Sequence, residues 1–135
     1  MSEPSSKRVL IVDDEMDMRI FMKTLFETSG WQAVVTRDGT QGLAEARRET
    51  PDLIVLDVMM PGEGGARMYL ALKEDPDLAD IPVIMHSAVK PDAFHHYLKM
   101  LNARSGSPIP SPDAYMEKPP EPDALLALAN RLVGP

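Results

Sequence analysis

The chain has 135 residues, of which 44% are hydrophobic, and it carries a formal net charge of −7 and no cysteine. That length fits one domain able to bury about two-thirds of its unfolded surface. The lack of cysteine excludes disulfides, thiolate metal sites and a cysteine nucleophile. The negative charge disfavours nucleic acid as a direct partner. No apolar run approaches the roughly 18 residues of a membrane span, and residues 1–6 lack a hydrophobic signal region, so we expect a cytoplasmic protein without membrane insertion.

Apolar runs of strand length alternate with segments of helical periodicity along the rest of the chain. The first and third runs are almost wholly aliphatic, which is typical of strands buried on both faces of a parallel sheet. The expected strands are 8–12, 31–36, 53–57, 81–86 and 114–117, and the expected helices are 17–29, about 40–50, about 66–74, 91–101 and the segment after residue 120. Asp38 or Thr40 is the expected N-cap of the second helix, and Pro122 is expected in the first turn of the last.

Strand and helix alternate five times, which predicts a single α/β domain with a parallel sheet and right-handed crossovers. Residues 1–6 are expected to form a disordered polar tail, and residues 7–135 the domain. The stretch 102–113 is rich in proline and has no apolar period, so we expect an extended loop there.

Polar side chains follow four of the expected strands at the point where each strand ends. Asp13 and Asp14 follow the first, Asp57 the third, Ser87 the fourth and Lys118 the fifth. These ends converge on one edge of a parallel sheet. Three carboxylates close together repel one another, which raises their pKa values or attracts a cation, and an oxygen-only cluster suits Mg²⁺. A carboxylate nucleophile with a metal, a lysine and a hydroxyl indicates phosphoryl transfer onto aspartate.

With these residues at the strand ends, and with Met60-Pro61-Gly62 and Lys118-Pro119 beside them, residues 7–134 resemble a response-regulator receiver domain of two-component signalling. The resemblance implies a flavodoxin-like fold, in which a single doubly wound five-stranded parallel sheet, in strand order 2-1-3-4-5, is flanked by five helices. It also implies a cis bond between Lys118 and Pro119.

The resemblance further implies a role for each residue of the site. Asp57 matches the phosphorylated aspartate and a metal ligand, Asp14 the direct Mg²⁺ ligand, Asp13 the acid that acts through water, and the backbone carbonyl of Met59 the third protein ligand. The switch and phosphate-binding positions match Ser87, Lys118, the aromatic Tyr115 and Ala88, whose small side chain keeps the phosphoryl site open. Tyr115 has a simpler alternative role, which is packing against the neighbours of the fifth strand.

Receiver domains assist their own aspartate phosphorylation and dephosphorylation and are not conventional enzymes. The partners that the resemblance implies are a sensor histidine kinase or phosphotransfer protein, a downstream protein target and a possible homodimer. One alternative is a pseudo-receiver, an interaction module whose state is not set by phosphorylation; the intact acids and lysine argue against it. Another is a Mg²⁺-dependent phosphohydrolase with an aspartyl intermediate, which would need an acid where Met59 stands.

The chain departs from the family between Ser87 and Lys118, where it is several residues longer and carries Pro112-Asp113 in place of the usual Gly-Ala. Our hypothesis is that the 102–113 loop alters or blocks the partner surface of the fourth helix and fifth strand. Three other features are interpreted structurally: His86 as a satisfied core or near-core histidine, His95-His96 as a solvated helix face, and Trp31 as a packing residue.

Overall fold

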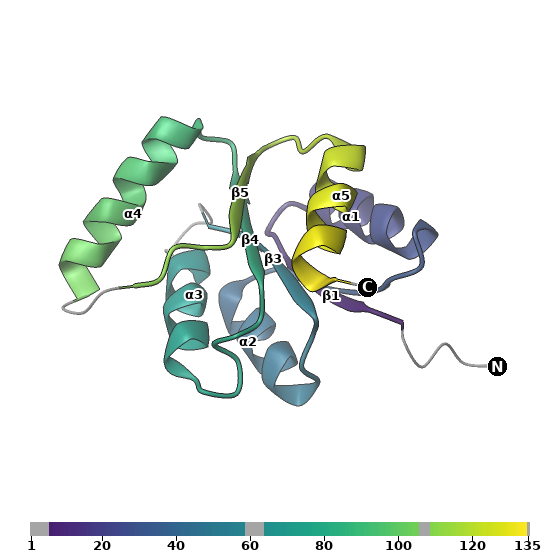
Figure 1. Cartoon of the computed structure of the whole chain (residues 1–135), viewed down its shortest axis with the longest axis horizontal. Helices are drawn as coiled ribbons and strands as arrows, with labels where there is room; N and C mark the ends of the chain where they lie inside the picture. Colours follow the sequence, from purple (N-terminus) through teal and green to yellow (C-terminus); the bar gives the residue numbers. More distant parts are fainter. Residues whose placement is uncertain (1–5, 59–63, 106–108, 135) are drawn as a thin grey trace.

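A five-stranded parallel sheet forms the centre of the molecule, in the order β2-β1-β3-β4-β5 (Figure 1). The computed structural model describes residues 6–58, 64–105 and 109–134. The strands are β1 (Arg8–Val12), β2 (Gln32–Thr36), β3 (Leu53–Asp57), β4 (Val83–Ser87) and β5 (Ala114–Glu117). The helices are α1 (Met16–Thr28), α2 (Gly39–Arg48), α3 (Gly64–Glu74), α4 (Pro91–Ser105) and α5 (Pro122–Val133). The predicted fold class and strand order are confirmed.

Helices cover both faces of the sheet, α1 and α5 on one and α2, α3 and α4 on the other (Figure 1). Successive residues of a strand point to opposite faces. Leu53 and Val55 of β3 therefore join the core under α1 and α5, and Ile54 and Leu56 join the core under the other three helices. Every residue of β3 and β4 is buried, which explains why the sequence shows continuous apolar runs and no alternation.

The ends of most elements lie within one or two residues of their predicted positions. The side chain of Asp38 accepts a hydrogen bond from the Gln41 amide at 2.8 Å, so Asp38 is the N-cap of α2. Pro122 lies in the first turn of α5, as predicted. The Lys118-Pro119 bond is cis. The predicted Met60-Pro61-Gly62 loop and residues 1–5 of the predicted tail lie outside the described residues.

Helix α4 is longer than predicted, because it continues past Leu101 to Ser105. Residues 102–104 are exposed, so they carry no apolar period that would mark them as helical, while Ala103 and Arg104 are good helix formers. The predicted loop from 102 to 113 was therefore wrong in its first four residues. Its last part is held in place: the Tyr69 hydroxyl donates to the Pro110 carbonyl, and the Val83 amide donates to the Asp113 carboxylate at 2.8 Å.

Trp31 closes the core at the amino-terminal edge of the sheet. It is buried and meets Phe26 of α1 edge-on, with ring centroids 5.2 Å apart. The ammonium of Lys7 lies 5.8 Å from the centroid of the Trp31 ring. The interpretation of Trp31 as a packing residue is confirmed.

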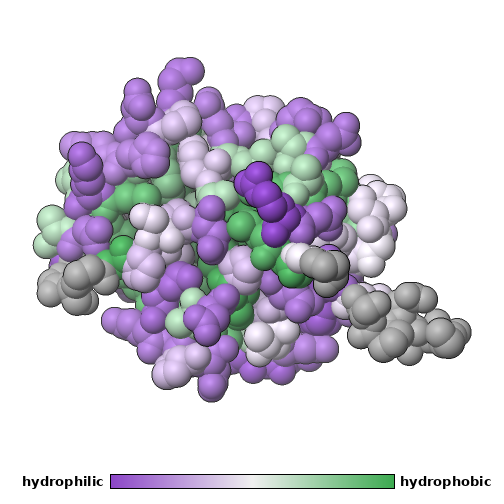
Figure 2. Space-filling model, viewed as in Figure 1, coloured by the Kyte–Doolittle hydropathy of each residue, from purple (hydrophilic) through white to green (hydrophobic). Residues whose placement is uncertain are grey.

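The surface is mostly polar, with a few exposed apolar side chains. Hydrophilic residues dominate the face shown in Figure 2, and hydrophobic residues show between them. Three apolar side chains of α1 are exposed, namely Met16, Ile20 and Phe21, although Phe21 fits the apolar period of that helix. The buried face of α1 carries Met22 and Phe26. Within 6–58, 64–105 and 109–134, no helix has the length and apolar character needed to cross a membrane.

Gly65 lets the first turn of α3 pass close to the end of β3. A Cβ added at Gly65 would lie 2.3 Å from the Asp57 carbonyl oxygen and 2.8 Å from Val58 Cα, and both are backbone atoms that cannot rotate away. A side chain here would push α3 away from the strand that carries Asp57.

We therefore expect Gly65→Ala to lower the free energy of unfolding by about 1–3 kcal/mol, since overpacking against backbone outweighs the gain in helix propensity. Urea unfolding followed by circular dichroism measures the change. An unaltered midpoint of unfolding would show that the turn relaxes at no cost and would contradict the prediction.

Candidate functional site

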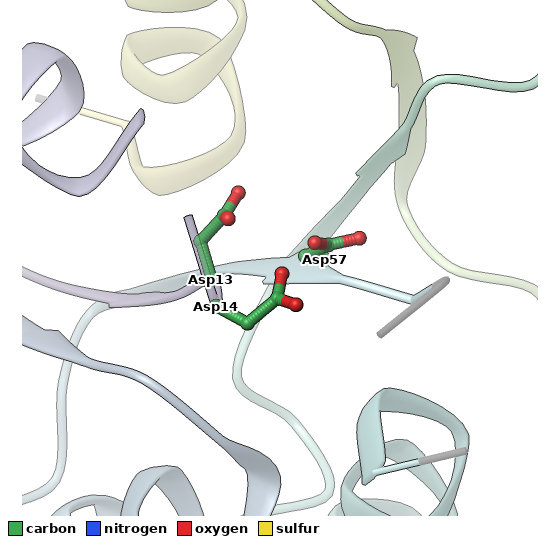
Figure 3. Close-up of side chains that lie close together, drawn as sticks. All are labelled: Asp13, Asp14 and Asp57. Atoms are coloured by element: carbon green, nitrogen blue, oxygen red, sulfur yellow. The ribbon is translucent and has the colours of Figure 1, made fainter. Parts of the chain in front are cut away.

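Three aspartates meet at the carboxyl edge of the sheet, as the sequence predicted (Figure 3). Asp13 and Asp14 follow β1, and Asp57 is the last residue of β3. One carboxylate oxygen of each lies within 4.8 Å of the others. Asp13 is 0% exposed and Asp57 4%, whereas Asp14 is exposed. The cluster therefore has two buried acids and one that faces solvent.

The backbone around Asp13 fixes the direction of its side chain. The Asp13 amide continues the β1–β2 ladder by donating to the Thr36 carbonyl at 3.1 Å. The Glu15 amide donates to Asp13 Oδ1 at 2.8 Å, and the Arg19 guanidinium donates to the Asp13 carbonyl at 2.7 Å. The other carboxylate oxygen of Asp13, Oδ2, lies 3.0 Å from the Lys118 ammonium.

Lys118 follows β5 and reaches into the acidic cluster. Its backbone amide donates to the Ser87 carbonyl at 2.7 Å, which extends the β4–β5 pairing past the strands. Its ammonium nitrogen lies 3.0 Å from Asp57 Oδ2, 3.0 Å from Asp13 Oδ2 and 2.6 Å from Glu15 Oε1. One lysine thus contacts three carboxylates.

The pKa values of the buried groups reflect this pairing. Burial raises the pKa of Asp13 above its ordinary value of 3.8, and the hydrogen bonds from the Glu15 amide and Lys118 offset only part of that rise. Burial alone would lower the pKa of Lys118, but its hydrogen bonds to Glu15, Asp13 and Asp57 outweigh burial and raise it. Lys118 therefore stays charged at neutral pH and balances part of the negative charge of the cluster.

Ser87 and Tyr115 form a second polar group behind the acids. The two hydroxyl oxygens are 2.8 Å apart, and the Tyr115 hydroxyl also donates to the Val89 carbonyl. Tyr115 has one hydroxyl proton and donates it to the Val89 carbonyl, so we assign Ser87 as the donor to the Tyr115 oxygen. The Tyr115 ring stacks on Phe94 of α4, with centroids 4.0 Å apart and planes 11° from parallel.

Of the other two predicted site residues, Ala88 lies among the described residues and Met59 does not. Ala88 follows Ser87 directly and is exposed at the edge of the site. Met59, whose backbone carbonyl was the predicted third ligand, lies outside the described residues. His95 and His96 lie on the exposed side of α4, which agrees with the interpretation of a solvated face.

Two neighbours of the cluster had no predicted role there. Glu15 is an exposed residue that contacts Lys118 across 103 positions of sequence. His86 is buried, as predicted, and its Nε2 lies 3.3 Å from Asp13 Oδ2. The prediction that His86 is satisfied was wrong: among the described residues, neither of its ring nitrogens has a hydrogen-bond partner. The signal available in the sequence was its position one residue before Ser87, at the same end of the sheet.

Comparison with known proteins agrees with this geometry. The family model of the response regulator receiver domain matches residues 9–106. The chain is 41% identical to the polar-differentiation response regulator DivK of Brucella anthropi over 83 residues, which cover 61% of this chain and 67% of that protein.

Solved structures give the same result. The receiver domain of Francisella response regulator 1452 is 31% identical, with a TM-score of 0.74 over 95% of this chain and 97% of that one. The signal receiver domain of a signal transduction histidine kinase from Syntrophus aciditrophicus is 28% identical, with a TM-score of 0.76 over 95% of this chain and 90% of that one. The chain therefore belongs to the response regulator receiver domains of two-component signalling.

Proposed function

We propose that residues 7–135 form one receiver domain in which Asp57 accepts a phosphoryl group from a sensor histidine kinase or a phosphotransfer protein. The observation that carries the proposal is the environment of Asp57. Its carboxylate lies at a strand end with two other acids nearby and with the Lys118 ammonium 3.0 Å away. A nucleophilic carboxylate, a fixed cation and a metal-binding cluster are the parts that phosphoryl transfer requires.

The three aspartates fit a magnesium ion. They offer only oxygen ligands, their ligand atoms lie within 4.8 Å of one another, and one of them faces solvent, where a bound ion would keep several waters. In our proposal Asp14, Asp57 and the Met59 carbonyl bind the ion directly, and Asp13 binds it through water. When bound, magnesium neutralises charge on the transferring phosphoryl oxygens.

In this proposal three residues of the chain take part in the phosphoryl transfer, namely Asp57, Lys118 and Ser87. A carboxylate oxygen of Asp57 attacks phosphorus, an O–P bond forms, and the N–P bond to the donor histidine breaks with its electron pair left on the imidazole nitrogen. Lys118 exchanges part of its carboxylate contacts for a phosphoryl oxygen. Ser87 supplies a hydroxyl proton to another oxygen, which requires it to leave Tyr115, because that proton is engaged there.

The Ser87 hydroxyl proton can go either to Tyr115 or to a phosphoryl oxygen. Conservative variants of Ser87 and Tyr115 should therefore differ in their rates of phosphorylation. Ser87→Ala removes a donor to the charged phosphoryl group, worth about 1.5–3 kcal/mol, so we expect phosphorylation at least about tenfold slower. Tyr115→Phe removes the competing acceptor together with the donor to the Val89 carbonyl and keeps the stack on Phe94, so we expect a rate within about twofold of wild type. Time courses of intact mass with a small phosphoryl donor measure both. Equal slowing in the two variants would contradict the assigned direction of the hydrogen bond.

The test of the proposal is the intact mass of the wild-type chain after incubation with Mg²⁺ and acetyl phosphate. We expect a gain of one phosphoryl group that is lost when EDTA removes the metal. If the mass does not change, the phosphorylation-independent pseudo-receiver becomes the better account of the chain.

The proposed consequence of phosphorylation is a change in how the domain binds a downstream protein target in the cytoplasm. A homodimer is one possible form of the phosphorylated domain. In this proposal the 102–113 segment alters or blocks the partner surface of α4 and β5. The contact of Tyr69 with Pro110 supports this, since it holds part of the segment against α3. A solution dimer through the α4–β5 face, with the segment intact, would count against a blocked surface.

A further inference from the structure

His86 belongs to the same cross-strand row as two of the aspartates, Asp13 and Asp57. In the parallel sheet Asp57 of β3 pairs with His86 of β4. The residues two positions earlier, Ile11, Val55 and Ile84, also form a row and face α1 and α5. Because side chains alternate with a period of two, Asp13, Asp57 and His86 point to that same face at the end of the sheet.

The imidazole of His86 is placed beside Asp13 but is not hydrogen-bonded. It is 1% exposed, and its Nε2 lies 3.3 Å from Asp13 Oδ2. The Lys118 ammonium lies 3.0 Å from the same oxygen. Neither ring nitrogen has a hydrogen-bond partner among the described residues. A buried polar group without a partner destabilises a fold, so its presence here calls for a role in another state of the site.

The proposed function supplies that state. When Lys118 binds a phosphoryl oxygen, Asp13 Oδ2 loses the cation that now lies 3.0 Å from it. Asp13 is 0% exposed, so bulk solvent does not reach Oδ2 to take the place of the lysine. The Nε2–H of His86 is a donor already beside it, because that nitrogen lies 3.3 Å from Asp13 Oδ2 and needs only a small movement to reach hydrogen-bond geometry.

We propose that His86 is a positioning residue that takes over Asp13 Oδ2 from Lys118 when Asp57 is phosphorylated. It acts on the phosphoryl group only through Asp13, which it keeps oriented toward the metal while Lys118 is engaged elsewhere. Outer-shell partners of this kind fix the orientation of metal-binding groups. This inference rests on the proposed phosphoacceptor function.

His86 performs this role as a neutral donor. Burial and, to a smaller extent, the nearby charge of Lys118 together lower its pKa to about 3. The ring therefore carries one proton at neutral pH, and the proposal places that proton on Nε2 with Nδ1 as the free acceptor. No proton is gained or lost in the exchange of partners.

Three variants isolate the Nε2 position. His86→Gln places an amide N–H near the position of Nε2, His86→Asn places it near Nδ1, short of Asp13, and His86→Leu removes it. Calorimetric titration measures Mg²⁺ alone and then beryllium fluoride, a phosphoryl analogue, in saturating Mg²⁺. We expect His86→Leu and His86→Asn to bind Mg²⁺ within about twofold of wild type and the analogue about tenfold more weakly, with His86→Gln close to wild type.

The outcomes separate this inference from the function on which it rests. A wild-type chain that binds neither Mg²⁺ nor the analogue overturns the proposed function itself. A wild-type chain that binds both, with His86→Leu binding the analogue equally well, overturns only the role of His86. An equal loss for Mg²⁺ alone and for the analogue also overturns the exchange of partners, because it would place His86 on Asp13 in every state.

A nitrogen NMR spectrum of the imidazole gives a readout that a merely structural histidine would not change. We expect the Nε2 resonance of His86 to shift when beryllium fluoride is added to the wild-type chain and its proton to exchange more slowly. A resonance unaffected by the analogue would contradict the new hydrogen bond. Thermal unfolding of the unliganded His86→Leu variant should show no loss of stability, since that change removes an unpartnered polar group.

Discussion

An Asp57→Asn variant is expected to gain no phosphoryl group under conditions in which the wild-type chain is fully modified. The amide has nearly the same shape as the carboxylate but is not a nucleophile at neutral pH, so the O–P bond does not form. The substitution also removes one of three neighbouring negative charges, and Lys118 keeps Asp13 and Glu15 as partners, so the fold should not lose stability. Intact mass measures the first effect and circular dichroism the second.

The matched control is Asp80→Asn, at an exposed position outside the acidic cluster, which should be phosphorylated like wild type. If Asp57→Asn still gains the mass of a phosphoryl group, another residue accepts it. Sensitivity of the label to hydroxylamine would then separate an acyl phosphate on a different acid from a phosphohistidine at His95 or His96.

Replacing Lys118 with methionine is expected to have the second largest effect, on both chemistry and stability. Three carboxylates lose the cation that they share. Removing one partner of a buried ion pair costs about 3–5 kcal/mol, and Lys118 is only 10% exposed, so we expect a loss near the lower end of that range at neutral pH. Phosphorylation of Asp57 should slow by at least about a hundredfold, as when a transition-state donor is removed.

The stability loss should depend on pH in a definite direction. Burial already raises the pKa of Asp13, and without Lys118 only the Glu15 amide opposes that rise, so the pKa climbs further. A pKa higher in the folded state means that ionised Asp13 destabilises the fold. That cost is full above the folded pKa, declines as pH falls through it, and vanishes below the unfolded value near 3.8. The deficit of Lys118→Met should therefore shrink from neutral pH toward pH 4.

Urea unfolding across this pH range measures the deficit, and Lys99→Met on the exposed side of α4 is the matched control. Added Mg²⁺ should restore part of the lost stability, since the ion supplies positive charge to the same cluster. A deficit that is equal at pH 5 and pH 8 would show that Lys118 acts through packing of its carbon chain rather than through charge.

The fold could be predicted because its strands are buried on both faces. Continuous apolar runs such as Leu53–Leu56 have few other interpretations when turn residues bound them and helical periods follow. The meeting of Asp13, Asp14 and Asp57 required only the topology, because parallel strands bring their carboxyl ends to one edge. Placement at the edge was thus available from the sequence, while the roles of these residues remain predictions.

The features that the sequence did not reveal depend on strand register or involve exposed residues. The pairing of His86 with Asp57 follows from the alignment of β3 with β4, which no local pattern specifies. The contact of Glu15 with Lys118 joins two chain segments through an exposed side chain. Residues 102–104 near the end of α4 are exposed, so helix propensity alone would have to identify them as helical, and propensity is a weak signal without an apolar face.

The burial of Trp31 has a practical consequence. It is the single tryptophan of the chain and lies at the amino-terminal edge of the sheet, whereas the acids lie at the other edge. Five residues of strand at about 3.3 Å each place roughly 16 Å between them. Tryptophan fluorescence should therefore report global unfolding and stay unchanged when the acidic cluster is altered. The stability of every variant at Asp57, Lys118 or His86 can then be ranked by one intrinsic signal that is independent of its phosphorylation.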